Sequence, residues 1–283
     1  MKTIHLNQRQ DIISLLNPVI TFCNIWHRRD LLRQLVLRNI QIRYKGTAIG
    51  LIWMVITPLI MLSVYTFVFS VIFKARWGTD FGDSKAAFAL IIFCGIVVFN
   101  IFSESVTGSV GGISGNPNYV KKVVFPLEIL PVSIVFSSMF FGLVSVGILL
   151  VGVALFLHTL SITVICLPVV LTPLFLLSCG IAWFVASLGV YIRDLTHIIG
   201  IVMQILFFMT PIFYNIDMVP EKFQHILNVN PLTPIVQMAR DVLIYSKWPH
   251  FGGLAAAFLI SLAVFQIGYV WFMKTKRGFA DVV

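Results

Sequence analysis

The residues of this chain that could take part in chemistry are mostly cations, and the largest group of them precedes the first long apolar run. Residues 26–45 form this basic leader, which contains Arg28, Arg29, Arg33, Arg38, Arg43 and Lys45. On a helical wheel, one arc holds Leu31, Leu32, Leu35, Val36 and Ile42, and the opposite arc holds Arg29, Asp30, Arg33, Gln34, Arg38 and Gln41. The pattern predicts an amphipathic helix at the membrane surface, with arginines against anionic headgroups. A solvated basic leader is the alternative.

A second polar group lies in a glycine-rich segment, residues 103–128, which we predict to be a cytoplasmic loop. It contains Asn116 and Asn118, followed by Lys121 and Lys122. Glycines before a lysine invite comparison with a phosphate-binding loop, but the spacing G-x-x-x-x-G-K-[ST] is absent here and throughout the chain. The glycines therefore favour close helix packing, and any work from ATP must come from another polypeptide.

The third group is the pair Arg193 and Asp194, which alone separates two apolar runs. Charges are costly in lipid, so we expect this pair at the water boundary or in a protein contact. One interpretation is an ordinary helix–turn–helix with an ion pair of little energetic value. The other is a rigid elbow that transmits force from a cytoplasmic partner, because the two runs are joined without slack.

Other kinds of chemistry find less support in the sequence. The six histidines are scattered, and neither H-E-x-x-H nor D-x-D occurs, whereas a membrane glycosyl- or acyltransferase needs a nucleophile, a metal or an acid–base cluster. The four cysteines form no C-x-x-C pair and are typical of small buried hydrophobes. An ion-coupled transporter would carry ionisable groups inside its spans and internal repeats, and neither is visible.

The composition identifies the class of protein that positions these groups. The chain has 283 residues, of which 59% are hydrophobic and 11% charged, whereas a soluble domain is about 25% charged. This predicts a polytopic, all-α membrane protein. The net charge of +9 would suggest nucleic acid as a partner of a soluble protein, but here it is explained by cationic cytoplasmic loops, and we expect no nucleic acid. Residues 1–20 lack the apolar run of a cleavable signal peptide.

We predict six transmembrane helices. A helix rises about 1.5 Å per residue, so about 20 apolar residues cross a bilayer. The six apolar runs are Ala48–Phe73, Ala86–Phe102, Ile129–Leu157, Ile162–Ile192, Leu195–Phe213 and Gly252–Met273. The chain is then a single domain, residues 1–283, with a cytoplasmic leader (1–47), a six-span bundle (48–273) and a cytoplasmic tail (274–283).

The cations also predict the orientation of the chain. With the N-terminus inside, the cytoplasmic segments hold 14 of the 20 basic residues, and the outer segments hold the other six, which are Lys74, Arg76, Lys85, Lys222, Arg240 and Lys247. Cytoplasmic loops carry an excess of lysine and arginine. Both termini are therefore predicted to be cytoplasmic.

The outer loop between the fifth and sixth runs, residues 214–251, is unusual. Pro220 fits the first turn of one short helix, and Thr233 and Pro234 fit the N-cap and first position of a second, predicted over Pro234–Tyr245. Neither helix is long enough to cross a bilayer. We predict a re-entrant hairpin that enters from outside, which is tolerated where the backbone is buried in protein or lines a watery cavity. A hairpin lying on the membrane surface is the alternative.

The order of several short motifs resembles a known family. They are Arg43-Tyr44-Lys45-Gly46-Thr47, Gly115-Asn116-Pro117-Asn118, Tyr191-Ile192-Arg193-Asp194-Leu195, Thr210-Pro211-Ile212-Phe213-Tyr214, Asn230-Pro231-Leu232-Thr233-Pro234 and Lys276-Arg277-Gly278-Phe279. From about Arg29 to Phe279 the chain resembles the ABC-2 type permeases of bacterial polysaccharide exporters, and most of all the O-antigen exporters of Gram-negative inner membranes.

The resemblance implies a homodimer bound to two separate ABC nucleotide-binding subunits, with ATP and Mg in those subunits and no cofactor in this chain. It implies a channel for an undecaprenyl-diphosphate-linked O-polysaccharide. Another cargo, such as capsular polysaccharide, teichoic acid or a drug, is the alternative for the same fold.

The resemblance also implies roles for individual residues. Contact with the ATPase is expected at Arg29, Arg33, Arg38, Asn116, Asn118, Lys121, Lys122, Arg193 and Asp194. Aromatic residues that could face the polymer are Tyr65, Phe99, Phe207, Phe208 and Tyr214, although core packing is the default for each. Guanidinium suits phosphate oxygens, so Arg28 and Arg43, with Lys45, are candidates for the lipid diphosphate.

Overall fold

The computed structural model describes residues 17–72, 85–121, 125–158 and 161–282, and every regular element in these ranges is helical. The leader forms α2 (Pro18–His27) and α3 (Arg29–Tyr44), and the longer helices are α4 (Trp53–Tyr65), α5 (Lys85–Val110), α7 (Ile129–Phe156), α8 (Leu167–Tyr191), α9 (Leu195–Met209) and α12 (Phe251–Thr275). The shorter helices are α6 (Pro117–Val120), α10 (Glu221–Val229), α11 (Leu232–Leu243) and α13 (Phe279–Val282). The all-α prediction is confirmed.

Among the described residues, five helical segments are long and apolar enough to cross a membrane: Gly50–Val68, Ala86–Val110, Ile129–Phe156, Ile162–Tyr191 and Phe251–Val282. The predicted fifth run forms only the 15 residues of α9. At about 1.5 Å per residue, α9 is about 23 Å long, shorter than the roughly 30 Å hydrocarbon core. The chain is a multi-pass membrane protein, and a crossing by α9 stays a prediction.

The prediction of a loop from residue 103 was wrong, because α5 continues to Val110. The helix satisfies the hydroxyl groups of this part internally: Ser105 and Ser109 are buried and donate to the carbonyls four residues earlier, at 2.6 Å in each case. Gly108 permits close packing there, because a Cβ at this position would lie 3.0 Å from the Ile134 side chain on α7. This contact agrees with the interpretation of the glycines as packing residues.

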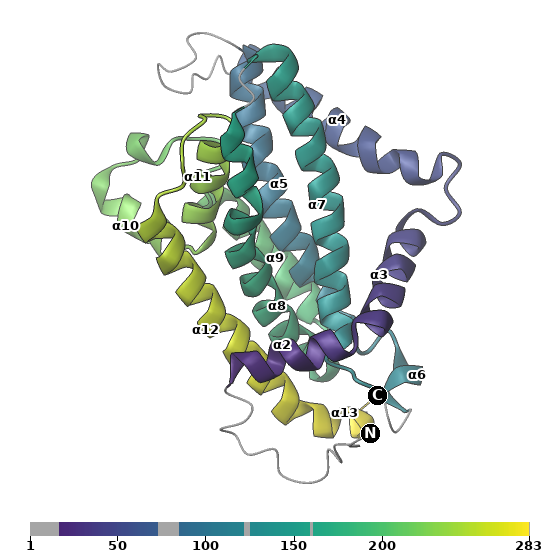
Figure 1. The fold of residues 1–283 in the computed structure, drawn as a ribbon. Coiled ribbons are helices and arrows are strands. Elements are labelled where there is room, and N and C mark those ends of the chain that lie inside the picture. The colour runs from purple at the N-terminus through teal and green to yellow at the C-terminus, as the bar shows by residue number, and fades with distance from the viewer. Residues whose placement is uncertain (1–16, 73–84, 122–124, 159–160, 283) are drawn as a thin grey trace.

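Helix α5 lies at the centre of the bundle, between α7, α8, α9 and α11 (Figure 1). A helix that is apolar on all sides belongs in an interior, and α5 is buried along most of its length. Helices α8 and α12 cross closely on one side of it. At their crossing, a Cβ on Gly268 would come within 2.1 Å of the Gly180 carbonyl oxygen, so only glycine fits.

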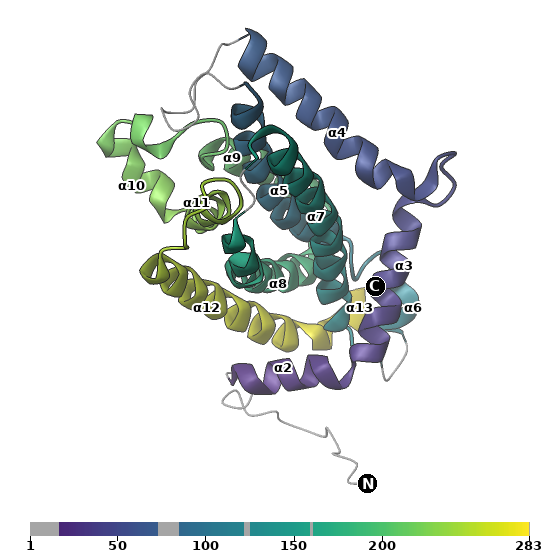
Figure 2. The ribbon, with the colours of Figure 1, turned by 45° about the horizontal axis from the view of Figure 1, so that its top comes forward.

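The leader packs on the protein with part of its apolar arc, although Ile42 of that arc is exposed. Leu32 and Leu35 are buried, and α3 lies against α7. Helix α2 crosses α12, where the Phe22 and Phe265 rings stack with centroids 5.0 Å apart. In contrast, α4 stands away from the bundle and buries none of its residues (Figure 2). Between α3 and α4, Gly46 and Gly50 have φ values of +85° and +59°, which favour glycine.

The predicted hairpin consists of α10 and α11, at the opposite end of the bundle from α6 and α13 (Figure 1). The end with α6 and α13 is called the inner end and the end with α10 and α11 the outer end, after the predicted orientation. Helix α11 begins at Leu232, so the predicted N-cap was wrong: Thr233 lies inside the helix and donates its hydroxyl to the Leu227 carbonyl at 2.7 Å. The sequence places Ile235, Met238, Val242 and Tyr245 at spacings of 3, 4 and 3, typical of one helical face. Ile235, Met238 and Val242 are buried as this spacing predicts, whereas Tyr245 lies after the end of α11 at Leu243. The backbone of α11 packs against α5 and α8 inside the protein.

Candidate functional site

The inner end of the molecule presents an exposed basic face. Arg29, Arg33 and Arg38 on α3 are exposed, as are Asn118 and Lys121 at α6. Arg38 joins the two helices, because its guanidinium donates to the Tyr119 hydroxyl at 2.8 Å. The structure therefore brings together leader and loop residues that lie about 80 positions apart in the chain. Lys122 lies outside the described residues.

The elbow residues lie at this same end. Arg193 and Asp194 are exposed, and just before them the Tyr191 hydroxyl donates to the Thr275 carbonyl at 3.3 Å. The elbow is thereby held beside the end of α12. Asn116 is partly buried and donates its side-chain amide to the Gly112 carbonyl at 3.1 Å, which closes the turn after α5.

A buried carboxylate that the sequence analysis missed ties three parts of the inner end together. The Glu128 side chain is 6% exposed and pairs with Arg28 of the leader and with Lys276, whose Nζ lies 2.7 Å from Oε2. The Trp183 indole donates to the Glu128 carbonyl at 2.9 Å. The sequence signal that could have identified it is its position: Glu128 is a single acid between Pro126 and the long apolar run that begins at Ile129. Arg28 is thus held by a partner that water scarcely reaches.

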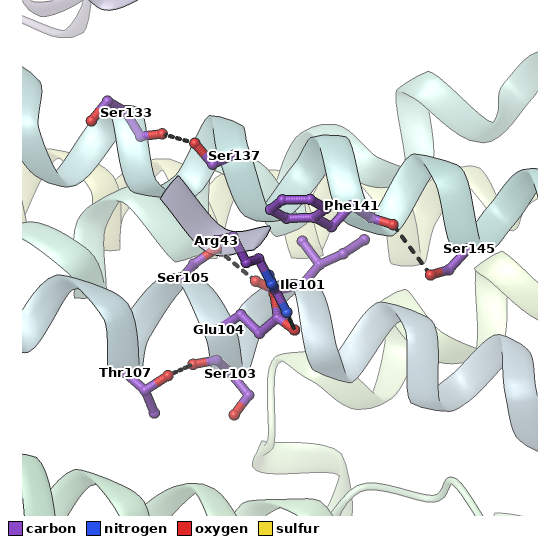
Figure 3. A network of polar contacts seen from close by, with 10 residues as sticks. All are labelled: Arg43, Ile101, Ser103, Glu104, Ser105, Thr107, Ser133, Ser137, Phe141 and Ser145. Atoms are coloured by element: carbon purple, nitrogen blue, oxygen red, sulfur yellow. Dashed lines mark hydrogen bonds and ion pairs between the residues drawn. The ribbon is translucent and has the colours of Figure 1, made fainter. Parts of the chain in front are cut away.

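Arg43 is also paired with a carboxylate, but in a different setting. It donates from Nη1 and Nη2 to the two carboxylate oxygens of Glu104 on α5, at 2.6 and 2.8 Å (Figure 3). Its guanidinium carbon lies 4.3 Å from the centre of the Phe141 ring on α7. The hydrogen bond to Glu104 raises the pKa of Arg43 further above its ordinary value, so this side chain stays charged. Glu104 was missed because it lay in the segment predicted to be a loop.

Two hollows adjoin this pair. A cavity of about 100 Å³ lies towards α4 and is lined by Thr57, Asn100 and Ser145, among others. An open hollow of about 280 Å³ lies towards the inner end, lined by Asn39, Thr107 and other residues. Arg43, Glu104, Ser138 and Phe141 line both. Lys45, the remaining diphosphate candidate, is exposed just after α3.

Four of the predicted aromatic residues lie in one cluster. Phe99 is buried on α5 and contacts Phe207 on α9, with ring centroids 5.0 Å apart. Phe207 also contacts Phe208, at 5.6 Å. Tyr65 joins them through Phe213, whose ring contacts both Tyr65 and Phe207. Phe99 is thus a core residue within this chain, whereas Phe208 is 63% exposed. The fifth residue, Tyr214, donates its hydroxyl to the Phe208 carbonyl at 3.1 Å.

At the outer end, Arg240 fastens α11 to the interior. It was counted from the sequence as an outer-loop cation, yet it is 4% exposed. Its Nη1 donates to the Pro211 carbonyl at 2.7 Å, its Nη2 to the Ile212 carbonyl at 2.8 Å and its Nε to the Ile91 carbonyl at 3.2 Å. Gly95 makes room for it, since a Cβ there would lie 2.7 Å from Nη2. The Pro211 and Ile212 carbonyls, which follow the end of α9, are thus hydrogen-bonded inside the protein.

Comparison with known proteins assigns this architecture. The family model for the ABC-2 type transporter matches residues 30–244, which is well over half of the chain. The chain belongs to the ABC-2 type transporter family. The O-antigen export system permease protein RfbA of Klebsiella pneumoniae is 24% identical, over 92% of this chain and 97% of that protein. RfbA of Myxococcus xanthus gives the same identity and coverage.

A relative with a different name matches a smaller part of this ABC-2 permease. The polysialic acid transport protein KpsM of Escherichia coli is 26% identical, over 74% of this chain and 80% of that protein. The matched family region, residues 30–244, contains Arg43, Glu104, Glu128 and Arg240, and excludes Arg28 and Lys276. Glu104, Glu128 and Arg240 thus lie within the matched ABC-2 region, whereas both partners of Glu128 lie outside it.

Proposed function

We propose that this chain is the permease subunit of an ATP-driven exporter that moves an undecaprenyl-diphosphate-linked O-polysaccharide across the bacterial inner membrane. The observation that carries the proposal is the match to O-antigen export permeases over 92% of this chain and 97% of their length. The match to KpsM is shorter, so capsular polysaccharide is the second candidate cargo. Teichoic acid and drugs are further candidate cargoes for the same fold.

The exposed basic face is the proposed docking site for the ATP-binding subunits. Acidic groups of the partner would contact five cations, with the elbow Arg193–Asp194 beside them. The cations are Arg29, Arg33, Arg38, Lys121 and Lys122. Two such subunits would hold the ATP and Mg. Because this face includes α3 directly before α4, movement of the docked subunits would be passed to the first span. The face would lie in the cytoplasm with both termini.

Two outward apolar surfaces support a homodimer. Helix α4 buries none of its residues, and Leu59, Ile60 and Val64 are among its exposed side chains. Helix α9 exposes Ile198, Ile201, Val202, Ile205, Phe208 and Met209 along one side. In the proposed mechanism these two spans meet the second copy around the channel, and ATP drives them apart. Phe208 and Tyr214 are the proposed aromatic contacts for the polymer.

The test is polymer export in cells that carry this chain with its ATP-binding partner. A partner variant that binds but does not hydrolyse ATP should leave the polymer in the cytoplasm, where extracellular glycosidase cannot reach it. Export that continues at the normal rate in that strain would contradict the proposal. Glycan analysis of the lipid that co-purifies with the complex distinguishes an O-polysaccharide from a capsular one.

A further inference from the structure

The pair of Arg43 and Glu104 differs from a purely structural ion pair in its surroundings. Their side chains are 39% and 37% exposed, and hollows adjoin them on two sides. The two bonds to Glu104 use two of the five N–H donors of the guanidinium. Either member can therefore turn towards water without burying an uncompensated charge. Arg28 has no such freedom, because its partner Glu128 is 6% exposed.

The pair lies near the ends of two candidate spans, which is where the hydrocarbon core gives way to polar headgroups. Arg43 lies seven residues before the first candidate span, which begins at Gly50. Glu104 lies six residues before the inner end of the span Ala86–Val110, about 9 Å at 1.5 Å per residue. Polar headgroups occupy this boundary layer. The cavity beside the pair is also lined by Met54, Thr57 and Pro58 of α4, so the pair adjoins the first candidate span.

We infer that Arg43 and Glu104 form an exchange site for the phosphate of a membrane lipid, in which the phosphate replaces the carboxylate on the guanidinium. A guanidinium binds phosphate and carboxylate oxygens through the same two-pronged geometry. Asn39, Thr107 and Ser138 add polar groups in the adjoining hollow. Glu104 holds Arg43 when the site is empty of lipid and opposes the bound anion, which favours release.

Two lipids offer this chemistry, namely a polyprenyl-diphosphate carrier and an anionic phospholipid. That the carrier is the natural occupant rests on the proposed function, whereas the exchange itself does not. The experiment is equilibrium binding of radiolabelled undecaprenyl diphosphate to the full-length chain in phosphatidylcholine nanodiscs. Parallel discs that contain phosphatidylglycerol as competitor distinguish the two sources.

The variants should shift binding in opposite directions. Arg43→Gln should weaken binding about tenfold, since a charge-assisted bidentate contact is lost. Glu104→Gln should strengthen it, because it removes the competing carboxylate and its repulsion of the anion. Arg43→Lys keeps the charge without the planar fork and should fall between the wild type and Arg43→Gln. The matched control is Lys274→Gln, which removes one exposed cation at the end of α12 and should leave binding within twofold.

The double variant Arg43→Gln/Glu104→Gln removes both charges and leaves no charge unpaired. It should unfold near the wild-type temperature yet bind as weakly as Arg43→Gln, which separates loss of the site from loss of the fold. Weaker binding in Glu104→Gln, in parallel with Arg43→Gln, would overturn the inference and make the pair structural. Equal competition by phosphatidylglycerol would support the phosphate site and assign it to phospholipid. If the variants do not change lipid binding while export still depends on ATP, the exchange site is wrong and the proposed function is not contradicted.

Discussion

Two arginines, Arg43 at the inner end and Arg240 at the outer end, show how one side chain serves two purposes in this molecule. Arg240 is almost completely buried and bonds to three backbone carbonyls. These carbonyls cannot move away from the guanidinium, because they are part of the packed backbone. Arg43 bonds to one side-chain carboxylate at a partly exposed surface. The contrast between Arg240 and Arg43 shows what decides the role of an arginine. Burial and backbone partners make a permanent structural contact, whereas partial exposure and a side-chain partner allow an exchangeable one.

Replacement of Arg240 should have the largest effect on stability. Arg240→Met keeps much of the apolar stem but leaves the buried Pro211 and Ile212 carbonyls without these donors. Each buried unsatisfied group costs about 1–3 kcal/mol, so a loss of about 3 kcal/mol is expected. Unfolding in detergent, followed by circular dichroism, measures it. The control is Arg277→Met, at an exposed arginine. Equal stability of the two variants would contradict a structural role for Arg240.

Gly95→Ala should have the next largest effect, because the added methyl group would lie 2.7 Å from Nη2 of Arg240. Overpacking of this kind costs about 1–3 kcal/mol. The control is Gly147→Ala on α7, where nothing lies within 4 Å of the added Cβ. That change should be neutral or stabilising by up to about 1 kcal/mol, since alanine is the better helix former. Equal losses at both positions would show that helix propensity, and not the space for Arg240, decides the outcome.

Arg43→Gln should have the smallest effect on stability, even though the bonds of Arg43 to Glu104, at 2.6 and 2.8 Å, are about as short as those of Arg240 to the Pro211 and Ile212 carbonyls. Exposed pairs contribute about 0–1 kcal/mol, because water screens them. The same unfolding measurement is expected to place Arg43→Gln within about 1 kcal/mol of the wild type. A loss as large as that of Arg240→Met would show that the inner pair is a second structural fastening.

The leader, the apolar helices and the elbow could be predicted from the sequence, because charge and hydropathy patterns depend on residues that are close together in the chain. The basic leader and the elbow at Arg193 appear where the pattern placed them. The apolar runs form helices, although the run from Ala86 continues to Val110 and the run from Leu195 forms only the 15 residues of α9. The apolar spacing of α11 also predicted its buried face. These features depend on neighbours in the chain, so a single sequence is enough to find them.

The charged contacts could not be predicted, because their partners lie far apart in the chain. Glu128 and Lys276 are 148 positions apart, and Arg240 and Ile91 are 149 apart. The end of α5 was misplaced because serine and threonine after Phe102 look like loop residues, whereas their hydroxyls bond within the helix. Arg240 looked like a solvent cation because a sequence does not show which loop residues turn inward.

The most direct test of the account is the native mass of the complex that purifies with this chain from cells that also make its ATP-binding partner. The account predicts two copies of this chain, two copies of the partner and a lipid-linked glycan released at high collision energy. A complex that contains one copy of this chain, or that forms without an ATP-binding subunit, would contradict it.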